Sequence, residues 1–210
     1  MRAVQTATGT ADGVRERLRA LFAAHGRPCV ATIGTFDGVH AGHRALVARA
    51  ASVARERGLP LVAVTFSPRP EVVTSSRRPL PDICGIDERV ARLRAAGAAD
   101  VVVVPFTRAL MGVSAAEFAA HLTDDLGMEV LCVGADFAFG RGRAGTVAAL
   151  RELGLEVVAV PTQARPGLRR KISSSSIRRA IAAGVPPGLA LSLTPDVRGD
   201  LEPLDDLRRL

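Results

Sequence analysis

The chain has 210 residues, of which 48% are hydrophobic and 23% charged, and this composition predicts one globular domain with a sizeable core. Its formal charge of +7 suits an anionic substrate, although charge alone says nothing about the fold. The three cysteines are scattered, which argues against a disulfide framework or a zinc site. Charged residues interrupt the N-terminus, which excludes a signal peptide, and no apolar run approaches the roughly 20 residues of a membrane span. We therefore expect a cytoplasmic protein.

Short apolar runs alternate along the chain with longer amphipathic runs, which predicts strands alternating with helices. In chain order we expect a strand at 28–33, a helix at 41–57, a strand at 59–66, a helix at 86–96, a strand at 100–105, a helix at 114–126, a strand at 129–133, a helix at 143–153, a strand at 155–160 and a helix at 172–183. Ser114 and Glu117 form a capping-box pattern at the start of the 114–126 helix.

Continuous apolar runs such as 101–104 are typical of strands that are buried on both faces. Together with the alternation, they predict an α/β fold with a parallel sheet flanked by helices. We divide the chain into a helical extension (1–27), the α/β domain (28–185) and a tail (186–210). The tail is rich in Pro, Gly and Asp and lacks a clear periodicity, so we expect it to be loosely packed.

The strongest local signal is the turn 34–43, which reads GTFDGVHAGH and lies where the first strand ends and the next helix begins. Free N–H groups at a helix start favour phosphate, and the glycines allow the backbone to approach a ligand closely. His40 and His43 are three residues apart, so both can project from one side of the first turn and stabilise charge on a phosphate. The alternatives are a glycine-rich turn with incidental histidines and a metal site, for which no third ligand is evident. The expected binding residues of this turn are Gly34, Phe36, Asp37, Gly38 and Gly42.

A run of serines precedes the last predicted helix, in the segment 171–179 that reads KISSSSIRR. Serines before an amphipathic run are typical of a helix N-cap, and their hydroxyls can also bind phosphate. Lys171 and Arg178 would add charge-assisted hydrogen bonds. The alternative is a plain cap on a solvated basic helix. The expected ligands in this segment are Lys171, Ser173, Ser174, Ser175 and Arg178.

A third candidate follows another apolar strand, in the segment 133–143 that reads VGADFAFGRGR. Asp136 has the position and chemistry to accept hydrogen bonds from a ribose, as acidic residues do in dinucleotide-binding folds. A carboxylate at a strand end is also a common turn former, so this motif alone leaves both interpretations open.

Taken together, the three segments resemble the FAD synthetase (FMN adenylyltransferase) domain of bacterial bifunctional riboflavin kinase/FAD synthetases. The resemblance covers about 29–184: residues 34–43 are similar to the family's GxFDGVHxGH, 133–140 to VGx[DN]FxFG, and 172–178 to ISSTxIR with Ser175 in place of Thr. It implies a doubly wound, Rossmann-like HxGH nucleotidylyltransferase fold that binds ATP with Mg²⁺. The implied reaction is a direct attack of the FMN phosphate on the α-phosphorus of ATP.

The resemblance also implies roles for individual residues. His40 and His43 become phosphate and transition-state ligands, Ser173, Ser174 and Arg178 bind the ATP phosphates, and Asp136 belongs to the nucleotide–flavin site. The family's TFDPHP is TFSPRP at 65–70, so Ser67 and Arg69 replace an acid and an imidazole near the expected acceptor. Residues 189–210 do not match the start of a riboflavin kinase barrel, so we expect no kinase activity.

Three alternatives stay open beside FMN adenylylation. The acceptor can be a modified flavin or another phosphorylated metabolite, or the chain can be a non-catalytic relative that binds flavin or nucleotide. Nucleic-acid binding through the basic stretch 157–195 lacks an aromatic platform and a recognisable motif, so we expect neither nucleic acid nor membrane as a partner.

Overall fold

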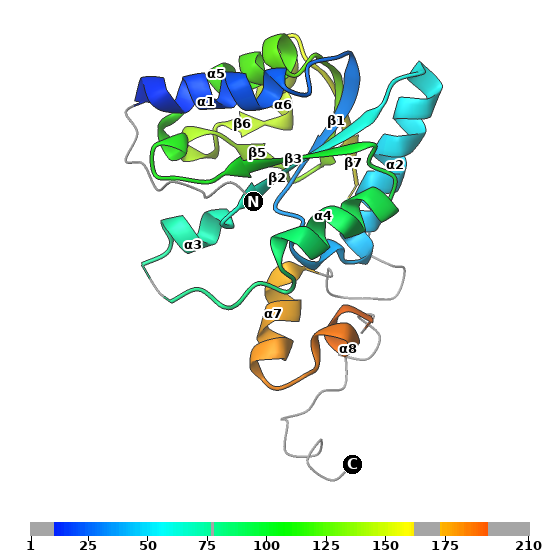
Figure 1. Cartoon of the computed structure of the whole chain (residues 1–210), viewed down its shortest axis with the longest axis vertical. Helices are drawn as coiled ribbons and strands as arrows, with labels where there is room; N and C mark the ends of the chain where they lie inside the picture. The colour runs from blue at the N-terminus through cyan, green and yellow to red at the C-terminus, as the bar shows by residue number, and fades with distance from the viewer. Residues whose placement is uncertain (1–10, 77, 162–172, 193–210) are drawn as a thin grey trace.

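Five apolar runs form one parallel sheet in the order β3-β2-β1-β4-β7 (Figure 1). The computed structural model describes residues 11–76, 78–161 and 173–192. The strands are β1 (Cys29–Ile33), β2 (Leu61–Ser67), β3 (Asp100–Pro105), β4 (Met128–Gly134) and β7 (Glu156–Val160). All five predicted strands are confirmed, with ends that differ by at most two residues. The chain adds strands first on one side of β1 and then on the other, so the sheet is doubly wound as predicted.

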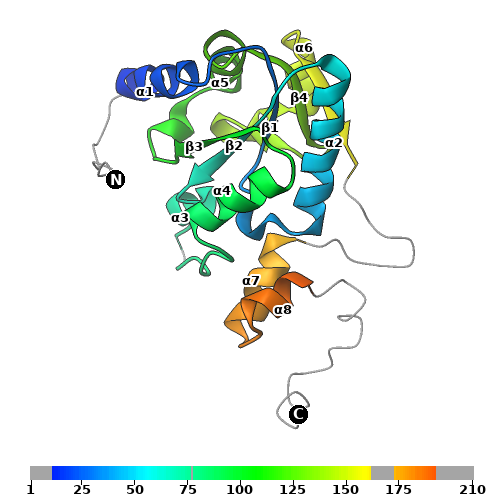
Figure 2. The same ribbon diagram turned by 45° about the vertical axis from the view of Figure 1, so that its right-hand side comes forward.

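Helices cover both faces of the sheet and bury their apolar sides against it (Figures 1 and 2). On one face lie α1 (Ala11–Ala23), α5 (Ala115–Ala120) and α6 (Val147–Glu152), and on the other lie α2 (Ala41–Arg57) and α4 (Ile86–Ala95). Phe22 of α1 is fully buried in the apolar core on the first of these faces, so α1 is an integral part of the layer that covers it. None of the helices in the described ranges has the length and apolar character needed to cross a membrane.

Two of the predicted helices differ in detail from those observed. The predicted 114–126 helix is α5 followed by a π-helical turn, η3 (His121–Asp125), and its capping box of Ser114 and Glu117 is confirmed. The helix predicted at 143–153 begins only at Val147, because Thr146 caps it by accepting the Ala149 N–H. The preceding residues form a small hairpin of β5 (Ala138–Phe139) and β6 (Gly145–Thr146), joined by the short helix η4 (Arg141–Arg143).

The C-terminal part of the described chain packs below the carboxyl ends of the strands (Figures 1 and 2). Here α7 (Ser174–Ala182) and α8 (Pro187–Ser192) bury Ile177 and Ala190 together with Ile83. The expectation of a loosely packed tail is therefore wrong for 187–192, because an apolar residue of this segment, Ala190, completes a small core. The remaining tail, 193–210, lies outside the described residues.

Three further short helices lie in connections. They are η1 (Asp37–Val39), α3 (Pro70–Thr74) and η2 (Leu110–Gly112). The strand order reverses between β1 and β4, and in open α/β sheets ligands bind outside the carboxyl ends of the strands at this point. The turn 34–43 follows β1 and Asp136 follows β4, so the fold brings two of the three predicted motifs to this position.

Candidate active site

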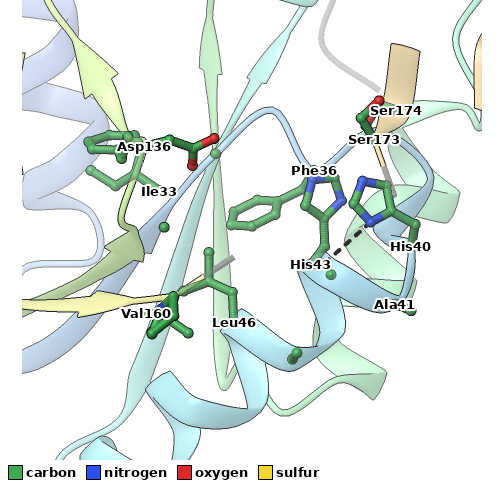
Figure 3. Close-up of a pocket in the computed structure, with 16 residues that line it drawn as sticks. Ile33, Phe36, His40, Ala41, His43, Leu46, Asp136, Val160, Ser173 and Ser174 are labelled. Carbon is green, nitrogen blue, oxygen red and sulfur yellow. Dashed lines mark hydrogen bonds between the residues drawn. The ribbon is translucent and has the colours of Figure 1, made fainter. Parts of the chain in front are cut away.

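A cavity of about 380 Å³ opens at the carboxyl ends of β1, β4 and β7 (Figure 3). Its size is within the range of small-molecule sites. The turn after β1 lines it with Gly34, Phe36, His40, Gly42 and His43. Asp136 lines it from the loop after β4, and Ser173 and Ser174 line it from the start of α7. The two turns that carry the histidines and the serines are far apart in the chain and meet at this one cavity.

The two histidines form a stacked pair at the start of α2. Their ring centroids are 3.7 Å apart and the rings are inclined by 17°. His40 is the N-cap of α2, and its Nδ1 accepts the His43 backbone N–H at 3.4 Å (Figure 3). Because Nδ1 of His40 is an acceptor, the ring carries its N–H on Nε2. A side chain on Gly42 would approach the His40 ring at 3.3 Å, so this glycine makes room for the pair.

His43 is held by its neighbours in a neutral state. Phe36 is buried and packs edge-on against its ring, with centroids 5.3 Å apart. Nδ1 of His43 is buried and has no hydrogen-bond partner among the described residues. Burial, the adjacent His40 imidazole and the Arg89 guanidinium lower the pKa of His43 well below its ordinary value. His43 therefore meets a ligand at neutral pH as an uncharged imidazole.

The start of α7 carries the second group of predicted ligands. Ser173 is its N-cap and forms a capping box with Ser176, which confirms the predicted cap. The cap leaves Ser173 and Ser174 at the cavity, where the helix start favours negative charge. Ser174 Oγ also donates to the Asp37 carbonyl oxygen at 3.3 Å, which ties α7 to the turn after β1. Lys171 lies outside the described residues.

Asp37, Gly38, Ser175 and Arg178 do not line this cavity. Asp37 is fully buried and accepts hydrogen bonds from the Ile83 N–H and from Arg178 Nη1, both at 2.9 Å. Gly38 has a φ of +76°, and a side chain there would lie 2.6 Å from Ile83. Ser175 and Arg178 line a second pocket beside the first. These residues therefore build the turn and its connection to α7.

Two buried arginines accompany Arg178 around Asp37, and the motifs gave no sign of their arrangement. Arg69 Nε lies 3.6 Å and Arg89 Nη2 3.8 Å from the Asp37 carboxylate. Asp82 pairs with both of these arginines. Arginine is seldom buried, and the burial of Arg69 depends on carboxylates elsewhere in the chain, so local sequence could not predict it. The one hint in the sequence was that Arg69 stands where the resembled motif has histidine.

Comparisons with known proteins bear on the same residues. The FAD synthetase family model matches residues 23–176, which include the turn after β1, Asp136 and the start of α7. The chain belongs to the FAD synthetase family. Two curated relatives are bifunctional riboflavin kinase/FMN adenylyltransferases. The one from Pseudomonas fluorescens is 40% identical over 75% of this chain and 51% of its own length. The one from Escherichia coli K12 is 35% identical over 73% of this chain and 50% of its own length.

A solved structure shares the fold over most of this chain. The crystal structure of a macrolide-efflux protein from Streptococcus pneumoniae aligns with a TM-score of 0.67 and 30% identity, over 74% of this chain and 52% of that one. The chain spans about half the length of the curated relatives described here. The matched region is therefore about half of each of these relatives.

Replacing Asp37 by Asn tests the buried carboxylate in the turn after β1. The substitution leaves Arg69, Arg89 and Arg178 without the buried carboxylate that they surround. We expect a loss of about 3–5 kcal/mol in the free energy of unfolding, measured by urea denaturation. Asp87→Asn, which changes an exposed acid in the first turn of α4, should cost less than about 1 kcal/mol. Equal losses in the two variants would contradict the role of Asp37.

The pH dependence of stability tests the neutral state of His43. In the unfolded chain His43 takes up a proton near its ordinary pKa of about 6.5, whereas in the folded chain its lowered pKa keeps it neutral until a lower pH. The unfolded state thus binds more protons than the folded state below about pH 6.5. The free energy of unfolding therefore decreases as the pH is lowered below about 6.5, by up to about 1.4 kcal/mol per pH unit. Urea unfolding at a series of pH values should show a shallower decline for His43→Asn than for the wild type, and parallel curves would refute the prediction.

Proposed function

We propose that this chain transfers the adenylyl group of ATP to FMN, forming FAD and pyrophosphate. The observation that carries the proposal is the convergence of His40, His43, Ser173 and Ser174 on one cavity at the switch point of the sheet. The two relatives described above are bifunctional riboflavin kinase/FMN adenylyltransferases, and the match covers about half of their length. Cytoplasmic flavin metabolism is the setting that we propose for it.

The cavity offers separate surroundings for the parts of ATP. The starts of α2 and α7 present backbone N–H groups and serine hydroxyls, which suit the phosphates. Gly134 and Val160 line the opposite part with backbone and apolar groups, and a flat adenine fits between such groups. Asp136 is the acceptor that we assign to the ribose hydroxyls, by the chemistry that acidic residues supply in related folds.

In the proposed reaction an oxygen of the FMN phosphate attacks the α-phosphorus of ATP in line with the bond that breaks. The new bond joins that oxygen to the α-phosphorus, and the α–β bridging oxygen leaves with pyrophosphate. The attacking phosphate is already ionised near neutral pH, so no residue has to remove a proton from it. Catalysis then rests on positioning and on stabilising charge at the phosphate, for which imidazole N–H groups are suitable donors.

We propose that Mg²⁺ enters with the nucleotide. The described residues contain no group of three or more His, Cys, Asp or Glu side chains that could hold a metal ion. Mg²⁺ commonly binds through substrate phosphates and waters with few protein ligands. Such an ion would neutralise charge on the phosphates, while His40, His43, Ser173 and Ser174 would orient them.

The compound that accepts the adenylyl group can be one other than FMN. Arg69, which replaces the imidazole of the resembled motif, is buried and bound to Asp82 and to the Leu80 carbonyl oxygen. It does not line the cavity, so it supplies no contact there for the flavin phosphate. A modified flavin or another phosphorylated metabolite is therefore the second candidate acceptor.

Incubation with ATP, Mg²⁺ and FMN tests the proposal directly. We expect FAD and pyrophosphate in equal amounts, separated and quantified by liquid chromatography. Riboflavin in place of FMN should give no FMN, since we assign only the adenylyltransferase reaction to this chain. Pyrophosphate release with a different phosphorylated acceptor, but not with FMN, would favour the second candidate. Binding of ATP without turnover of any acceptor would favour a non-catalytic relative.

Replacing His43 by Ala separates catalysis from binding. Hydrogen bonds from His43 should tighten as charge develops in the transition state, so we expect kcat to fall about 100- to 1000-fold. The Kd for ATP should change by no more than about threefold, measured by calorimetry. His25→Ala is the matched control, because His25 pairs with Asp100 and does not line the cavity. A parallel loss of turnover and of ATP affinity would count against this role.

A further inference from the structure

The turn that joins β5 to β6 carries two arginines for which the proposed reaction has no use. Arg141 and Arg143 are exposed residues of η4, and neither side chain has a hydrogen bond or an ion pair within the described residues. The same holds for Arg108, in the loop that follows β3. The acid of the neighbouring helix α5, Glu117, is paired with Arg15. Three guanidinium groups therefore stand at the surface without a carboxylate of their own.

The loops that carry Arg108 and Arg141 lie side by side. The Arg141 backbone N–H donates to the Val113 carbonyl oxygen at 3.0 Å, and Val113 ends the short helix η2. The same loop begins at Thr107, whose carbonyl oxygen accepts the Met111 N–H at 3.2 Å. Arg108 is thus in a compact turn that is hydrogen-bonded to the 140–143 turn, and the positive charges of the two turns gather on one part of the surface.

The backbone of the 140–143 turn has an unfavourable conformation. Gly140, Gly142 and Arg143 have φ values of 73°, 65° and 60°, and such a value is uncommon for a residue with a side chain. A side chain on Gly140 would lie 2.8 Å from the Ala115 backbone, so the turn packs closely against the start of α5. Tertiary contacts thus fix a strained turn, and strain that is retained in this way clusters at functional sites.

The 140–143 turn is continuous with one wall of the active-site cavity. Phe137 lines the cavity, and its ring stacks on that of Phe139 with centroids 5.5 Å apart. Arg141 follows Phe139 by two residues. Figure 3 shows that Asp136, which precedes Phe137, lies across the cavity from His40. The described residues that line the cavity include no arginine or lysine, so the unpaired positive charge is beside the cavity and not in it.

We propose that Arg108, Arg141 and Arg143 form a steering surface, which attracts phosphorylated substrates from solution and delivers them to the cavity. The choice of ATP and FMN as these substrates rests on the proposed function. Uncompensated positive charge beside a cleft raises the local concentration of an anion and its association rate, and salt screens this effect. Because the arginines lie outside the cavity, they act on association and leave the dissociation rate and kcat unchanged.

Stopped-flow binding of FMN and of riboflavin to the full chain tests the proposal, because the two flavins share a ring system and only FMN carries a phosphate. In the double variant Arg141→Gln, Arg143→Gln we expect the association rate constant of FMN to fall about two- to fivefold at about 10 mM ionic strength, where the Debye length is about 30 Å. The difference should vanish at about 1 M, where that length is about 3 Å. Association of riboflavin and dissociation of FMN should be unchanged.

The matched control removes the same net charge from the opposite end of the sheet. Arg27 precedes β1 and Arg55 lies near the end of α2, and both are exposed. The double variant Arg27→Gln, Arg55→Gln should bind FMN at the wild-type rate, because a steering effect depends on where the charge lies. Equal slowing of FMN in the two double variants would show that only net charge matters, and would overturn the proposal.

A second pair of probes makes the test independent of the acceptor. The N-methylanthraniloyl derivatives of ATP and of adenosine should differ as FMN and riboflavin do, whether or not FAD is formed. Equal slowing of the charged and uncharged member of a pair would indicate a distorted cavity and contradict steering. So would wild-type association of both anions with Arg141→Gln, Arg143→Gln, or no binding of either anion at millimolar concentration. FAD formation without any such rate effect would leave the proposed function standing and refute the steering surface alone.

Discussion

The ion pair between Asp37 and Arg178 joins residues that are 141 positions apart and lies in the interior of the molecule. A buried carboxylate is tolerated only when it is paired and hydrogen-bonded, and Asp37 meets this condition through Arg178 and the Ile83 N–H. The two partners come from the turn after β1 and from α7, and the hydrogen bond from Ser174 Oγ to the Asp37 carbonyl oxygen joins the same two segments. These contacts hold the segments together where they line the cavity with His43 and Ser174.

The turn after β1 needs such support because its backbone is strained. Phe36 and Val39 have φ values of 49° and 45°, and a positive φ is especially unfavourable for a β-branched residue such as Val39. Arginines from the flanking helices hold the carbonyl oxygens of this turn, with Arg92 donating to Gly38 and Arg44 to Val39. The conformation that presents His40 and His43 is therefore maintained by tertiary contacts, and the local sequence alone would not adopt it.

Much of the fold follows from local patterns, and the departures have physical reasons. The strand β1 and the helix α2 could be predicted closely because apolar runs, helical spacing and capping groups are all encoded within a few residues. The stacked histidines follow from their spacing at a helix start. The late start of α6 could not be predicted, since residues 138–146 pair as a hairpin before the helix begins. The burial of Arg69 and Arg89 depends on Asp37 and Asp82 and leaves no periodic signal.

The engagement of Arg178 with Asp37 also changes how the cavity can hold a triphosphate. No arginine or lysine is found among the described residues that line it. Helix starts, serine hydroxyls and the neutral imidazole of His43 are left to meet the phosphates, and such groups orient an anion well but neutralise little of its charge. The fixed cations lie one helical turn away, in the pocket around Arg69 and Arg178. Tight binding of a nucleotide in the cavity then requires charge that the described walls do not supply, which is the physical reason to expect that ATP binds together with a divalent cation.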